Sequence, residues 1–331
     1  MRQTVSVIFT VLNEAGTIEV LLDSLCQQTR SPDEVVVVDG GSGDGTYQKL
    51  EQFAKGAPFP VKVLSRPGSN ISEGRNAAIA SATGPLIAST DAGVRLEADW
   101  LAELVAPFED SNAPDVVSGF FVPDPHSLFE LVLGAVTLPR LEEIDPQTFH
   151  PSSRSVAFRR RAWQAMGGYP EWLDYCEDLL FDFALRDAGF TFTFNPNAVV
   201  HFRPRHTLKA FFRQYYRYAR GDGKADFWRY RHALRYAFYL LACPLLVALA
   251  LFVHPAWVLL LIGGLASTMY RPFWRLAPHL RKLPWGRRLR ACAWVPLIRW
   301  TGDIAKMLGY PVGVWWRWHH APKKVWPKRQ I

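Results

Sequence analysis

Acidic side chains are nearly absent from the second part of this 331-residue chain. Residues 201–331 carry 24 Lys and Arg but only 3 Asp and Glu, a net charge of +21, whereas residues 1–200 carry 14 and 27, a net charge of −13. The basic part also holds 10 of the 13 tryptophans, so we expect it to contact anionic lipid headgroups and a membrane. Nucleic acid is the alternative partner, but its binding surfaces do not need long uncharged stretches, so we expect no nucleic-acid partner.

Cysteine is also scarce. The four cysteines, Cys26, Cys176, Cys243 and Cys292, form neither a C-x-x-C pair nor a zinc-ligand spacing. The first ten residues read as a strand and lack the apolar core and the cleavage site of a signal peptide. We therefore expect the first part of the chain to stay in a reducing, cytoplasmic setting.

Apolar strands alternate with helices from residue 1 to about residue 200. This alternation predicts an α/β sandwich with a mainly parallel sheet. The expected strands are 5–11, 35–39, 61–65 and 86–90, the helices between them are 16–28, 46–55 and 72–82, and further strand candidates are 116–122, 155–158 and 191–194.

Four consecutive valines, Val35 to Val38, lead directly into Asp39 and a glycine-rich loop. Residues that are apolar on both faces suit a buried parallel strand, and ligands bind beyond the carboxyl ends of such strands. The glycines at 40, 41, 43 and 45 fit neither the G-x-G-x-x-G spacing nor a P-loop. A carboxylate at Asp39 could accept hydrogen bonds from a nucleobase or ribose, although an aspartate after a strand is more often a turn residue or a helix cap.

Four further elements follow a definite order along the chain. They are Thr10-Val11-Leu12-Asn13-Glu14, Ser72-Glu73-Gly74-Arg75-Asn76-Ala77-Ala78, Ser89-Thr90-Asp91-Ala92-Gly93, and Gly167-Gly168-Tyr169-Pro170-Glu171 followed by Cys176-Glu177-Asp178. Together with Asp39 they resemble the inverting family 2 glycosyltransferases of the GT-A fold, over about residues 3–220. The resemblance implies an enzyme that transfers a sugar from a nucleotide-diphosphate donor to an acceptor.

The resemblance also implies roles for single residues. The nucleoside of the donor would be held by Thr10, Leu12, Glu14 and Asp39, and Arg75 would lie near the diphosphate. Asp178, next to Glu177, would deprotonate the acceptor hydroxyl; the alternative role of this pair is to cap a helix N-terminus. One base is enough for this reaction, whereas a glycoside hydrolase needs two carboxylates because its leaving group must be protonated.

A divalent cation is implied at the end of the fourth strand. Asp91 matches one carboxylate of the family's metal-binding D-x-D, but Gly93 stands at the second aspartate position, which leaves metal dependence open. Oxygen ligands suit Mg²⁺ or Mn²⁺, and Mg²⁺ commonly binds through one or two carboxylates plus substrate phosphates, so Asp91 alone can suffice. His201 matches a family histidine that can join the metal, and a histidine at a domain edge is the alternative.

Aromatic residues alternate with arginines over residues 207–230. This pattern predicts helices in the headgroup plane or, alternatively, a basic amphipathic helix packed on the soluble domain. Gln214, Arg217 and Tyr218 resemble the Q-x-x-R-W element of processive polysaccharide synthases, with tyrosine in place of tryptophan. The resemblance implies that Gln214 and Arg217 help to bind substrate, and a chance match is the alternative.

Two apolar segments, 235–253 and 256–270, follow and are separated by His254-Pro255. Basic residues flank the pair and are missing from the turn, so the positive-inside rule predicts a transmembrane hairpin with both ends in the cytoplasm, although the second segment is short for a span. Residues 291–308 are ambiguous between an interfacial or re-entrant segment and a third span, because Arg299, Asp303 and Lys306 are costly in lipid. The basic residues 323–329 also favour the cytoplasmic side.

These patterns predict a GT-A domain over 1–205, a basic interfacial region over 206–232, a transmembrane hairpin over 233–271 and a Trp-rich interfacial or re-entrant region over 272–331. We expect a multi-pass enzyme of the inner (cytoplasmic) membrane that uses a nucleotide-sugar donor and a lipid or lipid-linked acceptor in cell-envelope glycan synthesis. The alternatives are a polyprenyl-phosphate acceptor that needs no base, an inactive partner protein with this fold, and a nucleotidyltransferase, which the lack of a Gly-rich, Lys-bearing loop near the N-terminus disfavours.

Overall fold

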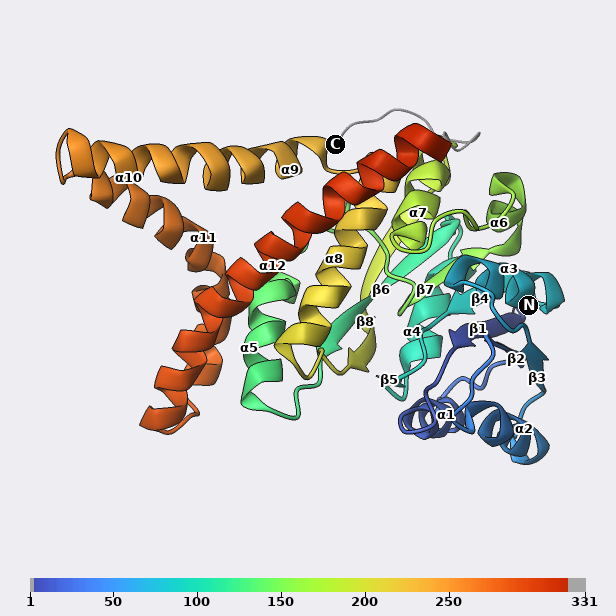
Figure 1. Cartoon of the computed structure of the whole chain (residues 1–331). Coiled ribbons are helices and arrows are strands. Elements are labelled where there is room, and N and C mark those ends of the chain that lie inside the picture. The colour runs from blue at the N-terminus through green and yellow to red at the C-terminus, as the bar shows by residue number, and fades with distance from the viewer. Residues whose placement is uncertain (1–2, 321–331) are drawn as a thin grey trace. The chain divides into compact units, whose positions relative to one another are not determined.

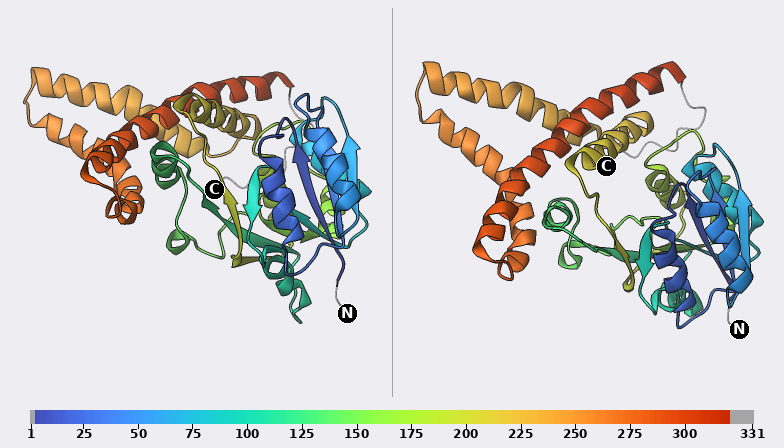
Figure 2. Two further views of the ribbon diagram at one scale, coloured as in Figure 1. Left: turned by 90° about the horizontal axis from the view of Figure 1, so that it is seen from below. Right: turned by 60° about the horizontal axis from the view of Figure 1, so that its bottom comes forward.

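The computed structural model describes residues 3–320, which form two compact units (Figures 1 and 2). The sheet unit comprises Met1–Pro123 and Leu141–Arg203, and the helical unit comprises Asp124–Arg140 and Pro204–Ile331. The last division, between residues 203 and 204, lies near the boundary at 205 that the sequence predicts. The segment 124–140 belongs to the helical unit, which the sequence pattern did not indicate.

The sheet unit is built on one mixed sheet, which within the described residues has eight strands in the order β3-β2-β1-β4-β7-β6-β8-β5. Four of its seven strand pairs are parallel, so the prediction of a mainly parallel sheet is confirmed. The strands are β1 (Val5–Val11), β2 (Glu34–Asp39), β3 (Val61–Ser65), β4 (Leu86–Ser89), β5 (Val94–Leu96), β6 (Val116–Pro123), β7 (Val156–Arg159) and β8 (Phe192–Phe202).

Helices connect the parallel strands, as crossover connections require. They are α1 (Ile18–Cys26), α2 (Thr46–Gly56) and α3 (Ile71–Ser81). The sheet unit also contains α4 (Trp100–Val105), α6 (Arg160–Met166) and α7 (Glu177–Asp187). Helix α3 begins where the sequence dictates, because Asn70 and Glu73 form a capping box that satisfies two backbone N–H groups. Short 3₁₀ turns lie at Ala106–Glu109 and Leu141–Glu143.

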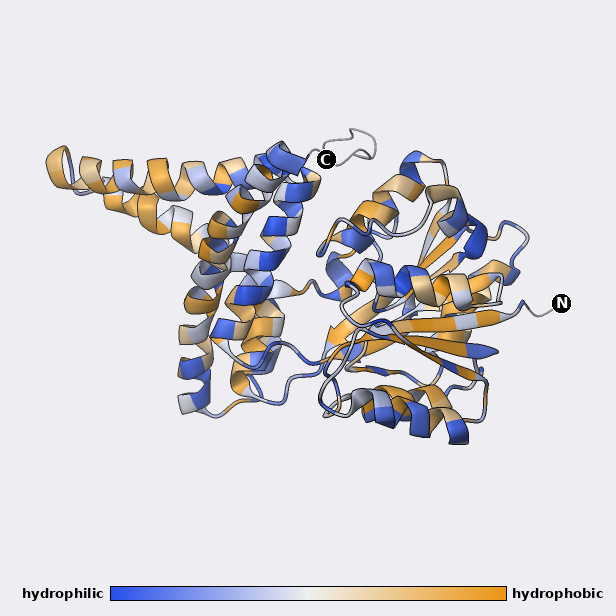
Figure 3. Ribbon diagram, turned by 45° about the vertical axis from the view of Figure 1, so that its right-hand side comes forward, coloured by the Kyte–Doolittle hydropathy of each residue, from blue (hydrophilic) through white to orange (hydrophobic). Residues whose placement is uncertain are grey.

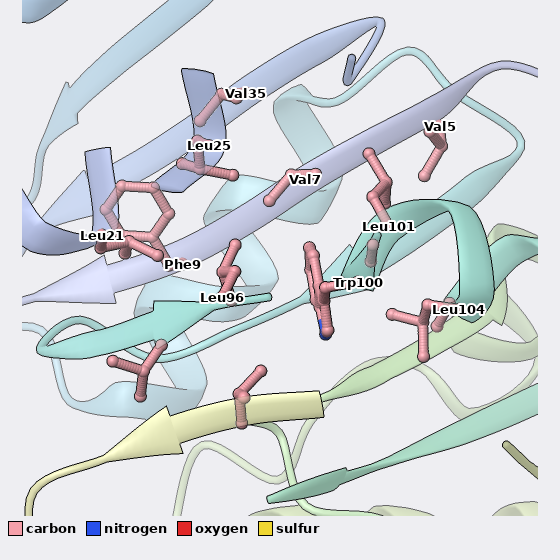
Figure 4. Close-up of a cluster of buried hydrophobic side chains, with 14 of the residues drawn as sticks. Val5, Val7, Phe9, Leu21, Leu25, Val35, Leu96, Trp100, Leu101 and Leu104 are labelled. Carbon is pink, nitrogen blue, oxygen red and sulfur yellow. The ribbon is translucent and has the colours of Figure 1, made fainter. Parts of the chain in front are cut away.

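The core of the sheet unit is apolar and lies beside β1. Alternate residues of a strand point to one face, and Val5, Val7 and Phe9 accordingly point from β1 toward side chains of α1 and α4 (Figure 4). Trp100 of α4 is fully buried, and its indole N–H donates to Ser155 Oγ at 2.9 Å. This packing fixes the strands whose ends carry the predicted site.

The helical unit contains α5 (Leu128–Thr137), α8 (Leu208–Ala225), α9 (Arg229–Tyr236), a π-helical segment (Ala237–Ala242), α10 (Cys243–Phe252), α11 (Trp257–Leu280) and α12 (Trp285–His320). Helices α8 and α12 approach at backbone distance. A Cβ added at Gly309 would lie 2.2 Å from the carbonyl oxygen of Tyr216, and one at Gly313 would lie 2.0 Å from that of Arg220. Small residues are therefore required at this crossing.

One helix within residues 3–320, Arg229–Phe252, is long and apolar enough to cross a membrane. It comprises α9, the π-helical segment and α10, and it is followed by the hydrophobic first half of α11 (Figure 3). The second half of α11 carries Arg271 and Arg275, so the second arm of the predicted hairpin does not meet the same criterion. The basic residues 323–329 lie outside the described residues.

Candidate functional site

The predicted nucleoside-binding residues meet at one edge of the sheet. Strands β2, β1 and β4 are parallel neighbours, with Val11 opposite Asp39 and Ile8 opposite Ser89. Because the carboxyl ends of parallel strands lie at the same edge, the segments that follow them form a common rim there. The topology therefore brings the segments after these three strands together, and their binding of a nucleoside stays a prediction.

The loop after β1 is tied to the loop after β2 by hydrogen bonds. The backbone N–H of Asn13 donates to Ser42 Oγ at 2.8 Å, and that of Glu14 donates to Thr46 Oγ1 at 2.9 Å. Thr10 contacts α3 so closely that a Cβ at Gly74 would lie 2.7 Å from its methyl group. These contacts fix the shape of the two loops. The Leu12 side chain of the first loop is exposed.

Asp39 is buried and uses its carboxylate to shape its own loop. It is 2% exposed, and Oδ2 accepts hydrogen bonds from the backbone N–H groups of Gly41 (3.0 Å) and Ser42 (2.9 Å). This is the behaviour of a turn-forming aspartate, the alternative considered from the sequence. Its contact with a nucleoside stays a prediction.

Arg75 joins the two acidic elements of the site. Its guanidinium donates to Glu177 Oε1 at 2.6 Å and to Asp91 Oδ1 at 2.9 Å, and the residue is only 2% exposed. It therefore fixes the N-terminus of α7 against the turn that follows β4. Its predicted place near a diphosphate is untested, and what the structure shows directly is that it positions two carboxylates.

Three acidic residues lie within the first two turns of α7. Burial, together with the nearby Asp178, raises the pKa of Glu177 to about 7 in spite of Arg75. Burial and Asp178 also raise the pKa of Asp182 well above its usual range. Asp178 is the one member of the three that is not buried, so it is the carboxylate that can reach a substrate.

The predicted metal ligands occupy different surroundings. Asp91 is paired with Arg75 and lies 3.7 Å from Arg154 Nε, whereas a ring nitrogen of His201 contacts Glu97. Gly93 has a φ of +75°, a backbone conformation that favours glycine. Within residues 3–320 no group of three or more Asp, Glu, His or Cys could hold a metal ion, so a cation here would need phosphate ligands as well.

Two residues of this site were missed by the sequence reasoning. Asn76 Oδ1 accepts hydrogen bonds from the backbone N–H of Tyr169 (2.8 Å) and the indole of Trp163 (3.0 Å), so it holds the Gly-Gly-Tyr loop in place. Its position directly after Arg75 was a signal that could have found it. Arg154 approaches Asp91 from the loop before β7, and no motif marked it.

Gln214 and Arg217 belong to α8 of the helical unit. Gln214 Nε2 donates to the Tyr218 hydroxyl at 2.8 Å, and Arg217 is exposed. The three residues of the Q-x-x-R-Y element therefore share one helix face, as i, i+3 and i+4 spacing requires. Their part in substrate binding stays a prediction.

Two family models match the chain, Glycosyl transferase family 2 over residues 6–162 and Glycosyl transferase family group 2 over residues 143–301. The succinoglycan biosynthesis protein ExoA of Rhizobium meliloti is 29% identical over 234 residues, which cover 66% of this chain and 68% of that protein. The cholesterol galactosyltransferase of Borreliella burgdorferi is 27% identical over 121 residues, which cover 37% of this chain and 34% of that protein.

A solved structure resembles the whole chain in its fold. The mannosyltransferase PcManGT from Pyrobaculum calidifontis, in complex with GDP-Man and Mn²⁺, superposes with a TM-score of 0.57 over 98% of this chain and 89% of that chain. The two sequences are 21% identical, so this likeness concerns the fold alone.

Proposed function

This chain belongs to glycosyltransferase family 2 and has the GT-A fold, and we propose that it transfers a sugar, with inversion, from a nucleotide-diphosphate sugar to a lipid or lipid-linked glycan at the cytoplasmic membrane face. The single observation that carries the chemistry is the Arg75 bridge. It holds Asp91 of the donor rim and Glu177 of α7 together, which brings the neighbouring Asp178 to the same edge of the sheet unit.

Asp178 serves as the general base of this reaction. It takes the proton of an acceptor hydroxyl while that oxygen forms a bond to the anomeric carbon, and the bond from that carbon to the diphosphate breaks on the opposite face. The electron pair of the broken bond leaves with the nucleoside diphosphate. Thr10, Leu12, Glu14 and Asp39, which line one edge of the sheet, hold the nucleoside.

The carboxylate of Asp91, together with the phosphates of the donor, would hold a divalent cation. The carboxylate is 28% exposed at the end of β4 and offers the hard oxygen that Mg²⁺ or Mn²⁺ prefers. His201, opposite Arg95 on the strand that follows this turn, is the candidate second ligand. When bound, such a cation would neutralise charge on the leaving diphosphate. The presence of Mn²⁺ with GDP-Man in the Pyrobaculum enzyme supports this part of the proposal.

The helical unit attaches the enzyme to the membrane. We define the outer stripe of α12 as all the exposed residues between 293 and 318, and every one is apolar: Ala293, Leu297, Trp300, Ile304, Leu308, Pro311, Val312, Trp315 and Trp318. With the apolar helix Arg229–Phe252, this stripe supports lipid attachment. The proposal also includes a transmembrane hairpin over 233–271 with both ends in the cytoplasm, and substrate binding by Gln214 and Arg217.

The test is an assay of the full chain in lipid nanodiscs with UDP-, GDP- and dTDP-sugars, scoring both nucleoside diphosphate and glycosylated lipid. Asp178→Asn should lower the transfer rate roughly 10²- to 10⁴-fold while leaving donor binding intact, because it removes the base. Asp187→Asn, at the exposed end of the same helix, is the matched control.

Normal transfer by Asp178→Asn to an acceptor phosphate would replace the base mechanism with the alternative in which the acceptor is already anionic. Wild-type protein that releases no nucleoside diphosphate from any donor would favour an inactive partner protein. Release of pyrophosphate would instead indicate a nucleotidyltransferase.

A further inference from the structure

The loop before β7 places one arginine beside Asp91. Strands β4 and β7 are antiparallel, with Ser89 opposite Val156, so the residues that precede β7 lie next to those that follow β4. The hydroxyl of Thr90, a fully buried residue, donates to the carbonyl oxygen of Arg154 at 3.0 Å. The backbone of Arg154 is thereby fixed at the rim of the sheet.

The Arg154 side chain is a fixed positive charge that is still open to solvent. Its Cζ lies 4.8 Å from the ring centre of Phe202 and 5.9 Å from that of Phe121, and Nη1 donates to Ser152 Oγ at 3.2 Å. Aromatic faces hold a guanidinium in place without neutralising its charge. The side chain is 24% exposed, in contrast to Arg75.

Arg75 and Arg154 also differ in how closely they approach Asp91. Arg75 donates hydrogen bonds to Glu177 at 2.6 Å and to Asp91 at 2.9 Å, whereas Arg154 Nε lies 3.7 Å from Asp91 Oδ2, at ion-pair distance. Gly93 stands at the second aspartate position of a D-x-D, so this position contributes no carboxylate to the rim. A guanidinium in such a place suits phosphate oxygens, which it can bind through two parallel hydrogen bonds.

We propose that Arg154 binds the diphosphate of the donor and stabilises the negative charge on the departing nucleoside diphosphate. This inference rests on the proposed function, because it presupposes a nucleotide-diphosphate donor. It adds a binding residue that neither the motifs nor the resemblance supplied, and it gives the site positive charge that does not depend on a metal ion.

The test is calorimetry of the full chain in nanodiscs with UDP and GDP, and with uridine and guanosine, in the presence of Mn²⁺ or of EDTA. Arg154→Gln should weaken nucleoside diphosphate binding roughly 10- to 100-fold, because it removes hydrogen bonds to a charged group, and should leave nucleoside binding within about threefold. The loss should be larger in EDTA, where no cation shares the phosphates. Arg154→Lys should recover part of the affinity.

Arg161→Gln is the matched control, since Arg161 is an exposed arginine of the same unit that pairs with Asp115. Equal binding of the diphosphate by Arg154→Gln and wild type would overturn the inference, and so would an equal loss of nucleoside and diphosphate. If the wild type binds neither UDP nor GDP, the proposed donor falls together with the inference. If the wild type binds one of them and Arg154→Gln binds it equally well, only the inference falls.

Discussion

The two units of this molecule differ in the side chains that they expose, because most of the exposed large apolar residues lie in the helical unit. In the sheet unit the valines of β2 are buried, and buried charged residues such as Glu34, Arg75 and Glu177 have hydrogen-bond partners. In the helical unit, α12 buries Val295 and Ile298, yet every exposed residue between 293 and 318 is apolar and Asp303 of this stretch is buried. The first arrangement is that of a protein in water, and the second suits a surface that meets lipid.

The inward charges of α12 are paired, which explains how the helix tolerates them. Asp303 accepts hydrogen bonds from Arg235 Nε and the Tyr239 hydroxyl, both at 2.9 Å, and lies 3.2 Å from Arg299 Nε. Lys306 lies over the ring of Tyr215 at 4.9 Å. The sequence argument counted these charges as a cost in lipid, and that cost disappears when they face protein partners.

We expect the largest effect from a substitution of Arg75, because this buried guanidinium pairs with two carboxylates of the sheet unit. Arg75→Met should lower the free energy of unfolding of this unit by about 3–5 kcal/mol, since it leaves Glu177 and Asp91 without their cation. Hydrogen exchange of α3 and α7 amides in the reconstituted protein measures the effect locally. Arg161→Met is the control, because Arg161 is exposed and pairs with Asp115. A loss below about 1 kcal/mol in Arg75→Met would show that the Arg75 bridge contributes little.

Glu34, at the opposite end of the strands, should make the stability of the sheet unit depend on pH. Its carboxylate is buried, yet hydrogen bonds from Ser6 (2.6 Å) and Thr83 (2.7 Å) outweigh burial and hold its pKa at about 2, below its ordinary value of 4.5. A lowered pKa means stability that is present above pH 4.5 and is lost as the pH falls toward 2. We expect about 2–3 kcal/mol of such acid-dependent stability. Thermal melting of Glu34→Gln should lack this slope, and an unchanged slope would contradict the assignment.

Much of the sheet unit could be predicted because its signals are local. Strands 5–11 and 61–65 agree with the structure to the residue, and capping and valine runs set the neighbouring elements. Strand β5 and helix α5 were missed because their partners are distant in sequence: β5 pairs with β8, and α5 packs against Phe211 and Val295. Segments that depend on non-local contacts carry little signal of their own.

The residues of the candidate site also differ in whether the sequence could identify them. The residues found from the sequence stand in contiguous motifs, such as Glu177-Asp178 and the Arg75 helix, where several letters support one another. Arg154 is a lone arginine in a loop, and it enters the site only because β4 and β7 pair. No spacing within the sequence encodes that neighbour, so the topology had to be known first.

The last prediction tests whether the outer stripe of α12 contacts lipid. In a variant whose four native cysteines are replaced by serine, Ile304→Cys should react with a membrane-impermeant maleimide roughly tenfold or more slowly in nanodiscs than after unfolding in SDS, because interfacial helices bury their apolar face in lipid. Leu141→Cys should react quickly in both, because Leu141 is 45% exposed against 53% for Ile304 but lies in the sheet unit. Fast labelling at residue 304 in nanodiscs would place the stripe in water, and protection that depends on protein concentration would instead assign it to a second copy of the chain.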